Sequence, residues 1–128
     1  MFHAQRFHRN IIKGASKIPQ RPKVDTVCNG IKPYLEAPSI VASKVFNPKL
    51  RISIPANFTK LIKDKQILQV KRKAKYILVY LEGNFVIVIH LGMSGRLTIS
   101  DKQYLPKKHD HVLIELSNGK LLIYNDTR

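Results

Sequence analysis

Short runs of apolar residues, separated by turn-forming residues, dominate the chain from residue 39 onward. The runs Tyr76–Leu81 and Phe85–Leu91 are almost wholly apolar, which is typical of strands covered on both faces. They are joined by Glu82-Gly83-Asn84, a short link of turn formers that is typical of a hairpin. The pattern therefore predicts a mainly β domain with antiparallel strands. The other expected strands are Ile40–Phe46, Leu50–Ile54, Ile67–Lys73, Arg96–Ile99, Val112–Leu116 and Leu121–Tyr124.

Two helices are expected beside these strands. Apolar residues recur at spacings of three and four between residues 24 and 35, which gives one apolar stripe on a helix that begins near Pro22. Pro33 should end or kink this helix near Lys32. A short helix is expected at Asn57–Lys63. Several short antiparallel strands with tight turns and a packed helix indicate a sandwich or a barrel.

The charge of the chain is strongly one-sided. Lys and Arg number 23 against 8 Asp and Glu, so the formal net charge is +15. A positive field of this size favours polyanions, meaning nucleic acid or an anionic membrane surface, and argues against a cationic substrate. The single cysteine, Cys28, excludes an intramolecular disulfide and any four-cysteine zinc module made by this chain alone.

The first 18 residues are basic and contain no acid. We expect them to form a basic arm without regular structure, or a targeting-like extension, because Arg-rich and acid-free segments are typical of organelle transit peptides. The domain itself is expected over residues 19–128. The chain would then act in the cytoplasm or nucleoid, or in an organelle if the extension is a transit peptide. No apolar run reaches the ~18 residues that a membrane helix needs.

Three segments could carry chemistry. Lys71, Lys73 and Lys75 would line one face of a strand, where they could contact phosphates or keep a strand edge from pairing. Met93 lies between two glycines and could either enter a base stack or fold back into the core. The segment 108–111 puts two histidines on one strand face. They could ligate a metal, but no third ligand is near in sequence, so a pair without a metal is expected.

Together these segments resemble one known family, the formamidopyrimidine-DNA glycosylases, which include endonuclease VIII. The resemblance covers residues 19–128 and implies a two-layer antiparallel β-sandwich flanked by helices. The reaction it implies is removal of oxidised purines from DNA followed by cleavage of the abasic strand. The matching segments are Pro19-Gln20-Arg21-Pro22-Lys23-Val24-Asp25-Thr26-Val27, Gly30-Ile31-Lys32-Pro33-Tyr34-Leu35, Arg72-Lys73-Ala74-Lys75-Tyr76, His90-Leu91-Gly92-Met93-Ser94-Gly95, Lys108-His109-Asp110-His111-Val112, Ser117-Asn118-Gly119-Lys120 and Tyr124-Asn125-Asp126-Thr127-Arg128.

The resemblance also implies roles for single residues, with double-stranded DNA as the partner. Lys75 would grip a phosphate near the lesion, and Met93 together with Arg128 would fill the gap left by the flipped base. His90 would support the backbone contact beside them. The residues expected to contact DNA are Lys75, His90, Met93, Arg128, Lys73 and Arg72.

Two residues depart from the family pattern where its chemistry takes place. The family's nucleophile is an N-terminal proline, whose free amine forms a Schiff base. Here Ile18 precedes Pro19, so the Pro19 nitrogen is a tertiary amide and cannot form one. Gln20 stands where the family has a glutamate that transfers protons. We therefore expect impaired catalysis, unless processing frees Pro19.

The family pattern continues past Arg128 into a helix-two-turn-helix module and a zinc finger, which this sequence does not contain. We therefore expect no metal or cofactor in this chain, and a separate chain could carry the C-terminal half. Two alternatives remain open: a non-catalytic DNA-binding remnant, or a basic β domain that binds RNA or acidic lipid.

Overall fold

Two four-stranded antiparallel sheets and two helices make up the described part of the chain, in a computed structural model that describes residues 2–6, 22–46 and 57–127. The first sheet has the strand order β1-β5-β4-β3, and the second has the order β2-β7-β8-β6. The elements are β1 (Phe2–Arg6), α1 (Pro22–Leu35), β2 (Ile40–Val45), α2 (Phe58–Ile62), β3 (Ile67–Lys73), β4 (Tyr76–Leu81), β5 (Phe85–His90), β6 (Gly95–Asp101), β7 (Asp110–Leu116) and β8 (Lys120–Asp126).

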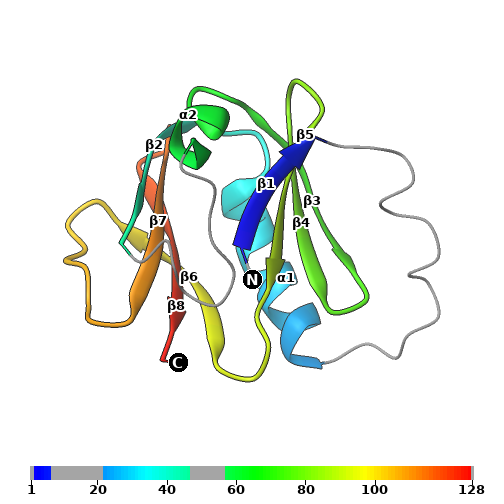
Figure 1. Ribbon diagram of the computed structural model, residues 1–128, viewed down its shortest axis with the longest axis vertical. Coiled ribbons are helices and arrows are strands. Elements are labelled where there is room, and N and C mark those ends of the chain that lie inside the picture. Colours follow the sequence, from blue (N-terminus) through cyan, green and yellow to red (C-terminus); the bar gives the residue numbers. More distant parts are fainter. Residues whose placement is uncertain (1, 7–21, 47–56, 128) are drawn as a thin grey trace.

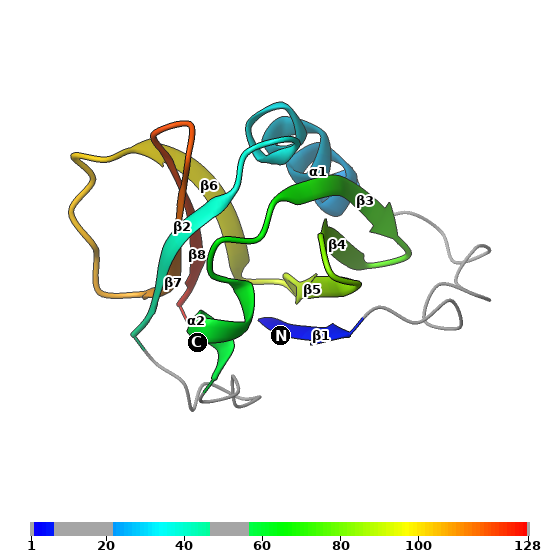
Figure 2. The ribbon, with the colours of Figure 1, turned by 90° about the horizontal axis from the view of Figure 1, so that it is seen from above.

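The two sheets face each other, and one helix lies at each open side between them (Figure 1, Figure 2). Helix α1 contacts β3 and β4 of the first sheet and β6 of the second, whereas α2 contacts β2 and β1. The arrangement is the two-layer sandwich with flanking helices that the sequence predicts. No helix in the described ranges is long and apolar enough to span a membrane.

The main core fills the space between the sheets. Ile77 and Val79 of β4 point into it, while Leu78 on the same strand joins Val86 and Val88 of β5 in a smaller cluster on the other face of the first sheet. Both strands are therefore covered on both faces, as their apolar sequences predict. Each fully buried aliphatic side chain contributes about 1.5–3 kcal/mol, so these strands hold much of the stability.

Helix α1 runs to Leu35, three residues beyond the end near Lys32 that Pro33 predicts. The proline removes one backbone N–H from the last turn. Ile31 and Leu35 are nevertheless buried, at 4% and 0% exposure, and the amide of Glu36 donates to the Lys32 carbonyl at 3.1 Å. Burial of the last apolar side chains therefore outweighs the lost hydrogen bond.

The structure also corrects the sequence prediction at residues 2–6. These residues form β1, which pairs antiparallel with β5 from Phe2 opposite Ile89 to Arg6 opposite Phe85. They were expected to belong to an arm without regular structure. The strand forms because the outer edge of β5 offers unpaired backbone groups, a requirement that the composition of the arm does not reveal. Residues 7–18 and the expected strand Leu50–Ile54 lie outside the described residues.

Candidate nucleic-acid interface

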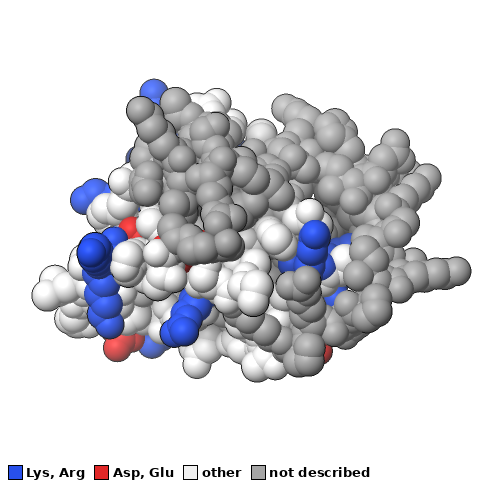
Figure 3. All heavy atoms as spheres, turned by 60° about the horizontal axis from the view of Figure 1, so that its bottom comes forward, with Lys and Arg blue, Asp and Glu red and all other residues white. Residues whose placement is uncertain are grey.

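Four parts of the chain meet at the lower end of the molecule in Figure 1. They are the β3–β4 turn, the loop between β5 and β6, the beginning of α1 and the end of β8. Figure 3 brings this end forward and shows Lys and Arg side chains spread over it, with little acidic surface. We call the surface made by residues 74–76 and 90–95 the lower face. It contains three of the predicted DNA contacts.

Lys75 lies in the β3–β4 turn and not in a strand. Ala74 has a φ of 54°, a conformation that reverses the chain, and β3 ends at Lys73, which pairs with Tyr76. The prediction that Lys71, Lys73 and Lys75 line one strand face is therefore wrong for Lys75. The turn leaves Lys75 exposed, and its Nζ lies 6.0 Å from the centroid of the Tyr76 ring. A cation there projects from the end of the sheet.

Arg72 is bound within the protein. Its Nε donates to Oδ1 of Asp25 in α1 at 3.0 Å, and its Nη1 donates to the carbonyl of Ala74 at 2.7 Å. The Arg72 side chain is only 13% exposed. It therefore joins α1 to the β3–β4 turn, so the structure places Arg72 as a support for the turn that carries Lys75.

His90 links this turn to the next loop. It is the last residue of β5 and pairs with Tyr76 of β4. The centroids of the two rings are 5.4 Å apart, with an interplanar angle of 45°. An aromatic pair in this tilted arrangement stabilises the ends of both strands. The lysine turn and the β5–β6 loop are thus fixed relative to one another.

Met93 lies in the β5–β6 loop with 87% of its surface exposed. The structure therefore excludes the alternative in which Met93 folds back into the core. The loop is closed by a hydrogen bond of 2.8 Å from the Gly95 amide to the Leu91 carbonyl, and Gly92 has a φ of 63°. A Cβ on Gly95 would lie 2.3 Å from the Leu91 oxygen, so only glycine fits. This close turn holds Met93 outward.

The histidine-containing segment anchors the Met93 loop. His111 is buried, and its Nε2 donates to the backbone carbonyl of Asp126 at 2.6 Å. The Oγ of Ser94, beside Met93, donates to Oδ1 of the same aspartate at 2.6 Å. Asp126 is itself only 3% exposed. Strands β7 and β8 therefore fix the loop through one shared residue.

Asp110 organises the loop that precedes β7. The Tyr104 hydroxyl donates to its Oδ2 at 2.5 Å, and the amide of Lys107 donates to the same oxygen at 2.7 Å. The Asn125 amide group donates to Oδ1 at 2.8 Å. Burial alone would raise the pKa of Asp110, but these hydrogen bonds outweigh it and lower that pKa. Burial and the bond to Asp110 raise the pKa of Tyr104 to about 12.

The structure does not bring the two histidines to one site. His109 is partly exposed, whereas His111 is buried and bonded to Asp126. Within the described ranges there is no group of three or more His, Cys, Asp or Glu placed to hold a metal ion. Pro19, Gln20 and Arg128 lie outside the described residues.

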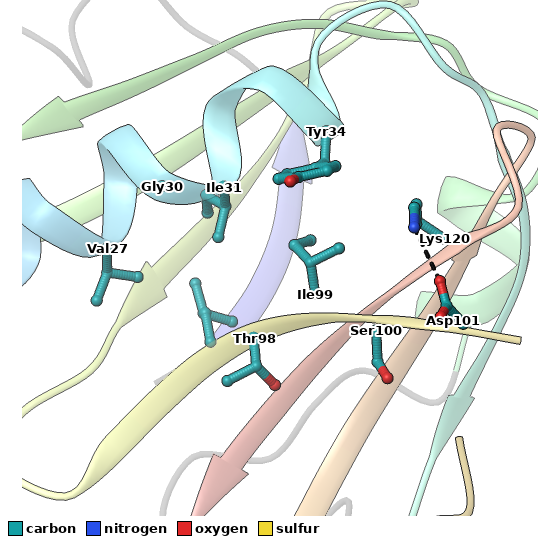
Figure 4. Close-up of a pocket in the computed structure, with 10 residues that line it drawn as sticks. Val27, Gly30, Ile31, Tyr34, Thr98, Ile99, Ser100, Asp101 and Lys120 are labelled. Carbon is teal, nitrogen blue, oxygen red and sulfur yellow. Dashed lines mark hydrogen bonds and ion pairs between the residues drawn. The ribbon is translucent and has the colours of Figure 1, made fainter. Parts of the chain in front are cut away.

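A hollow of about 590 Å³ lies between α1 and β6 (Figure 4). Its walls include Ile31 and Tyr34 of α1 and Ile99 of β6, and the ion pair between Lys120 and Asp101, 2.8 Å long, lies at one side. This bond raises the pKa of Lys120. Among the described residues, none of the predicted DNA contacts lines the hollow.

Comparison with known proteins shows which class of protein has this fold and these motifs. The family model for the formamidopyrimidine-DNA glycosylase N-terminal domain matches residues 18–128. Formamidopyrimidine-DNA glycosylases from Legionella pneumophila (strain Lens) and Escherichia coli O7:K1 are 41% and 43% identical over 111 residues, which cover 87% of this chain and 40% of each relative. The chain therefore belongs to the formamidopyrimidine-DNA glycosylase N-terminal domain family and spans about 40% of the length of these relatives.

Solved structures show the same fold. A crystal structure of Lactococcus lactis Fpg (MutM) with DNA containing FAPY-dG has a TM-score of 0.77 at 24% sequence identity, covering 84% of this chain and 40% of that chain. A complex of the Lactococcus lactis protein with DNA containing an abasic site has a TM-score of 0.78, also at 24% identity, over 86% of this chain and 41% of that one. The two-layer sandwich expected from the motifs is thus confirmed.

Proposed function

We propose that this chain is a DNA-binding domain of the formamidopyrimidine-DNA glycosylase type and that its lower face contacts double-stranded DNA. The observation that carries the proposal is the position of Lys75 and Met93 on two fixed turns at one end of the fold. A lysine suits a phosphate, and an apolar side chain held outward suits a gap in the base stack. The net charge of +15 adds a general attraction for the polyanion.

The lower face loses little conformational entropy on binding DNA, because its two turns are already fixed. Arg72 fixes the turn of Lys75, and the Gly95 turn with Asp126 fixes the loop of Met93. Preformed contacts lose less conformational entropy on association than mobile ones. In this proposal Lys75 binds a phosphate beside the damaged base, and Met93 fills the space that the base leaves when it flips out of the stack. Lys73, the last residue of β3, adds positive charge next to the turn of Lys75.

Lys75→Ala is expected to weaken binding to a short duplex and to lower the slope of log K against log salt by about 1, because one phosphate contact is lost. The measurement is a fluorescence anisotropy titration at several salt concentrations. Lys60→Ala is the matched control, since Lys60 is an exposed lysine on α2, at the opposite end of the molecule in Figure 1. Equal losses in the two variants would show that only total charge matters.

We also propose that base excision by this chain is impaired. The support is chemical: the amide nitrogen of Pro19 has no lone pair available for Schiff-base formation, and Gln20 cannot cycle a proton near neutral pH. We further propose that the chain acts in the cytoplasm or nucleoid, or in an organelle if its extension directs it there. A second chain that carries the rest of the family protein would strengthen the grip on DNA.

Borohydride trapping on duplex DNA with an 8-oxoguanine or an abasic site tests this chemistry. We expect no covalent adduct beyond a background on exposed lysines and the terminal amine, which peptide sequencing would identify. A family enzyme with a free N-terminal proline is the positive control. A lesion-dependent adduct at Pro19 of the processed chain, or at any other single residue in high yield, would contradict the proposal.

A further inference from the structure

Two edge strands of this fold, β3 and β2, carry features that discourage pairing with another chain. Strand β3, at one edge of the first sheet, has the exposed Lys71 and a shift in register between Ile67 and Gln69. Strand β2, at one edge of the second sheet, has the exposed Lys44 and a similar shift near Ala42. Charged side chains and bulges at edges are the usual protection against unwanted strand addition.

Strand β5 has neither feature. The sequence Phe85–His90 contains no Lys, Arg, Asp, Glu or Pro, and its pairing with β4 runs without a shift in register. Residues 86–89 are at most 7% exposed. This is the sequence of an interior strand, and such a strand left open at one side would pair readily with any extended segment.

The strand that covers β5 comes from outside the family domain. The family model begins at residue 18, whereas β1 consists of residues 2–6 and forms five residue pairs with β5. Among the described strands, β1 alone lies next to β5 on the side away from β4. Within the described residues that match the family, no strand pairs with this edge, and a segment upstream of them closes the sheet.

We propose that the outer edge of β5 is a strand-acceptor site, and that the N-terminal extension fills it in cis with Phe2–Arg6. The ligand is an extended peptide, bound through main-chain hydrogen bonds of the kind used in β-strand addition. The extension is then part of the folded domain and not a removable arm. This inference is independent of DNA binding.

Amide hydrogen exchange of the full chain tests the proposal. Alternate amides of a strand point to opposite neighbours, so one set of β5 amides bonds to β4 and the other set faces β1. Replacing residues 2–6 by Gly-Ser-Gly-Ser-Gly is expected to speed exchange at least tenfold at every second amide within residues 85–90, with the others unchanged. Slow exchange restored by self-association also supports an acceptor edge, because a second copy then fills it.

A pair of proline variants supplies the matched control. It also tests the proposal if the chain with residues 2–6 replaced does not fold. His3→Pro and Ala4→Pro alter neighbouring residues of an outermost strand, so one loses an N–H that faces β5 and the other an N–H that faces away from the sheet. Only the variant that loses the N–H facing β5 is expected to speed amide exchange on the β1 side of β5. Fast exchange of those β5 amides in the intact chain, or no change in any monomeric variant, would overturn the proposal.

Discussion

Gly95→Ala is expected to lower the free energy of unfolding by about 3 kcal/mol or more, which places it among the most damaging single changes. The added Cβ would lie 2.3 Å from the carbonyl oxygen of Leu91 and 2.9 Å from its Cα. Both are backbone atoms, so no side chain can move aside. Relief requires opening the turn and breaking the 2.8 Å hydrogen bond between Gly95 and Leu91. Urea unfolding followed by circular dichroism measures the loss.

Gly30→Ala is the matched control for this prediction. Gly30 is an exposed residue of α1, and apart from the neighbouring helix backbone no heavy atom lies within 4 Å of a Cβ added there. Because alanine favours the helix over glycine, this variant is expected to be more stable by about 0.5–1 kcal/mol. Opposite signs for the two variants support the assigned role of the Gly95 turn. A similar loss in both would mean that the close approach at Gly95 is not what makes glycine necessary.

Asp110→Asn is expected to cost about 2–4 kcal/mol of stability at neutral pH. The two carboxylate oxygens of Asp110 accept hydrogen bonds from Tyr104, Lys107 and Asn125. An asparagine of the same shape offers one oxygen only, and its NH₂ group would face at least one of these donors. A partly buried donor would then lose its acceptor, and the free energy lost includes the cost of leaving that donor unpaired.

The same variant should change how stability depends on pH. The pKa of Asp110 is lowered from 3.8 in the folded state, so the folded protein holds its proton less tightly than the unfolded chain. The resulting stabilisation is present above about pH 4 and is lost as the pH falls through the folded-state pKa. Asp110→Asn is expected to flatten this acid limb below about pH 4. Unchanged acid sensitivity would contradict the assignment.

Asp101→Asn serves as the control for both measurements. Asp101 forms an ion pair of 2.8 Å with Lys120, and its side chain is 69% exposed. Exposed pairs contribute little because water and salt screen them. Its removal is expected to leave both the stability at neutral pH and the acid limb nearly unchanged. The contrast with Asp110 separates a buried, hydrogen-bonded carboxylate from an ordinary surface charge.

The sequence predicts the parts of this fold that rest on local pattern. The apolar runs of β4 and β5 identify two strands covered on both faces, and the stripe of α1 identifies its buried side. The ordered motifs identify the family and the two-layer fold. These features could be predicted because burial imposes a period on the residues themselves.

Other features depend on contacts that no local pattern records. Arg72 meets Asp25 across 47 positions, so its place inside the protein could not be seen in the basic run. Ala74 reverses the chain with a positive φ although it is not glycine, which moved Lys75 out of the strand. Residues 2–6 form a strand because no other described strand pairs with the outer edge of β5. The sequence of the histidine segment does not show that His109 lies outside β7 while His111 is buried and bonded to Asp126.

A heteronuclear NMR titration of the full chain with a short duplex that contains an abasic site tests the DNA-contacting face most directly. Amide shifts are expected at residues 74–76 and 90–95, in the two turns that present Lys75 and Met93. The amide shifts of residues 57–63, which include α2 at the far end, should not change. Shifts centred on α2, or small shifts spread evenly over the basic surface, would contradict a DNA interface at the lower face.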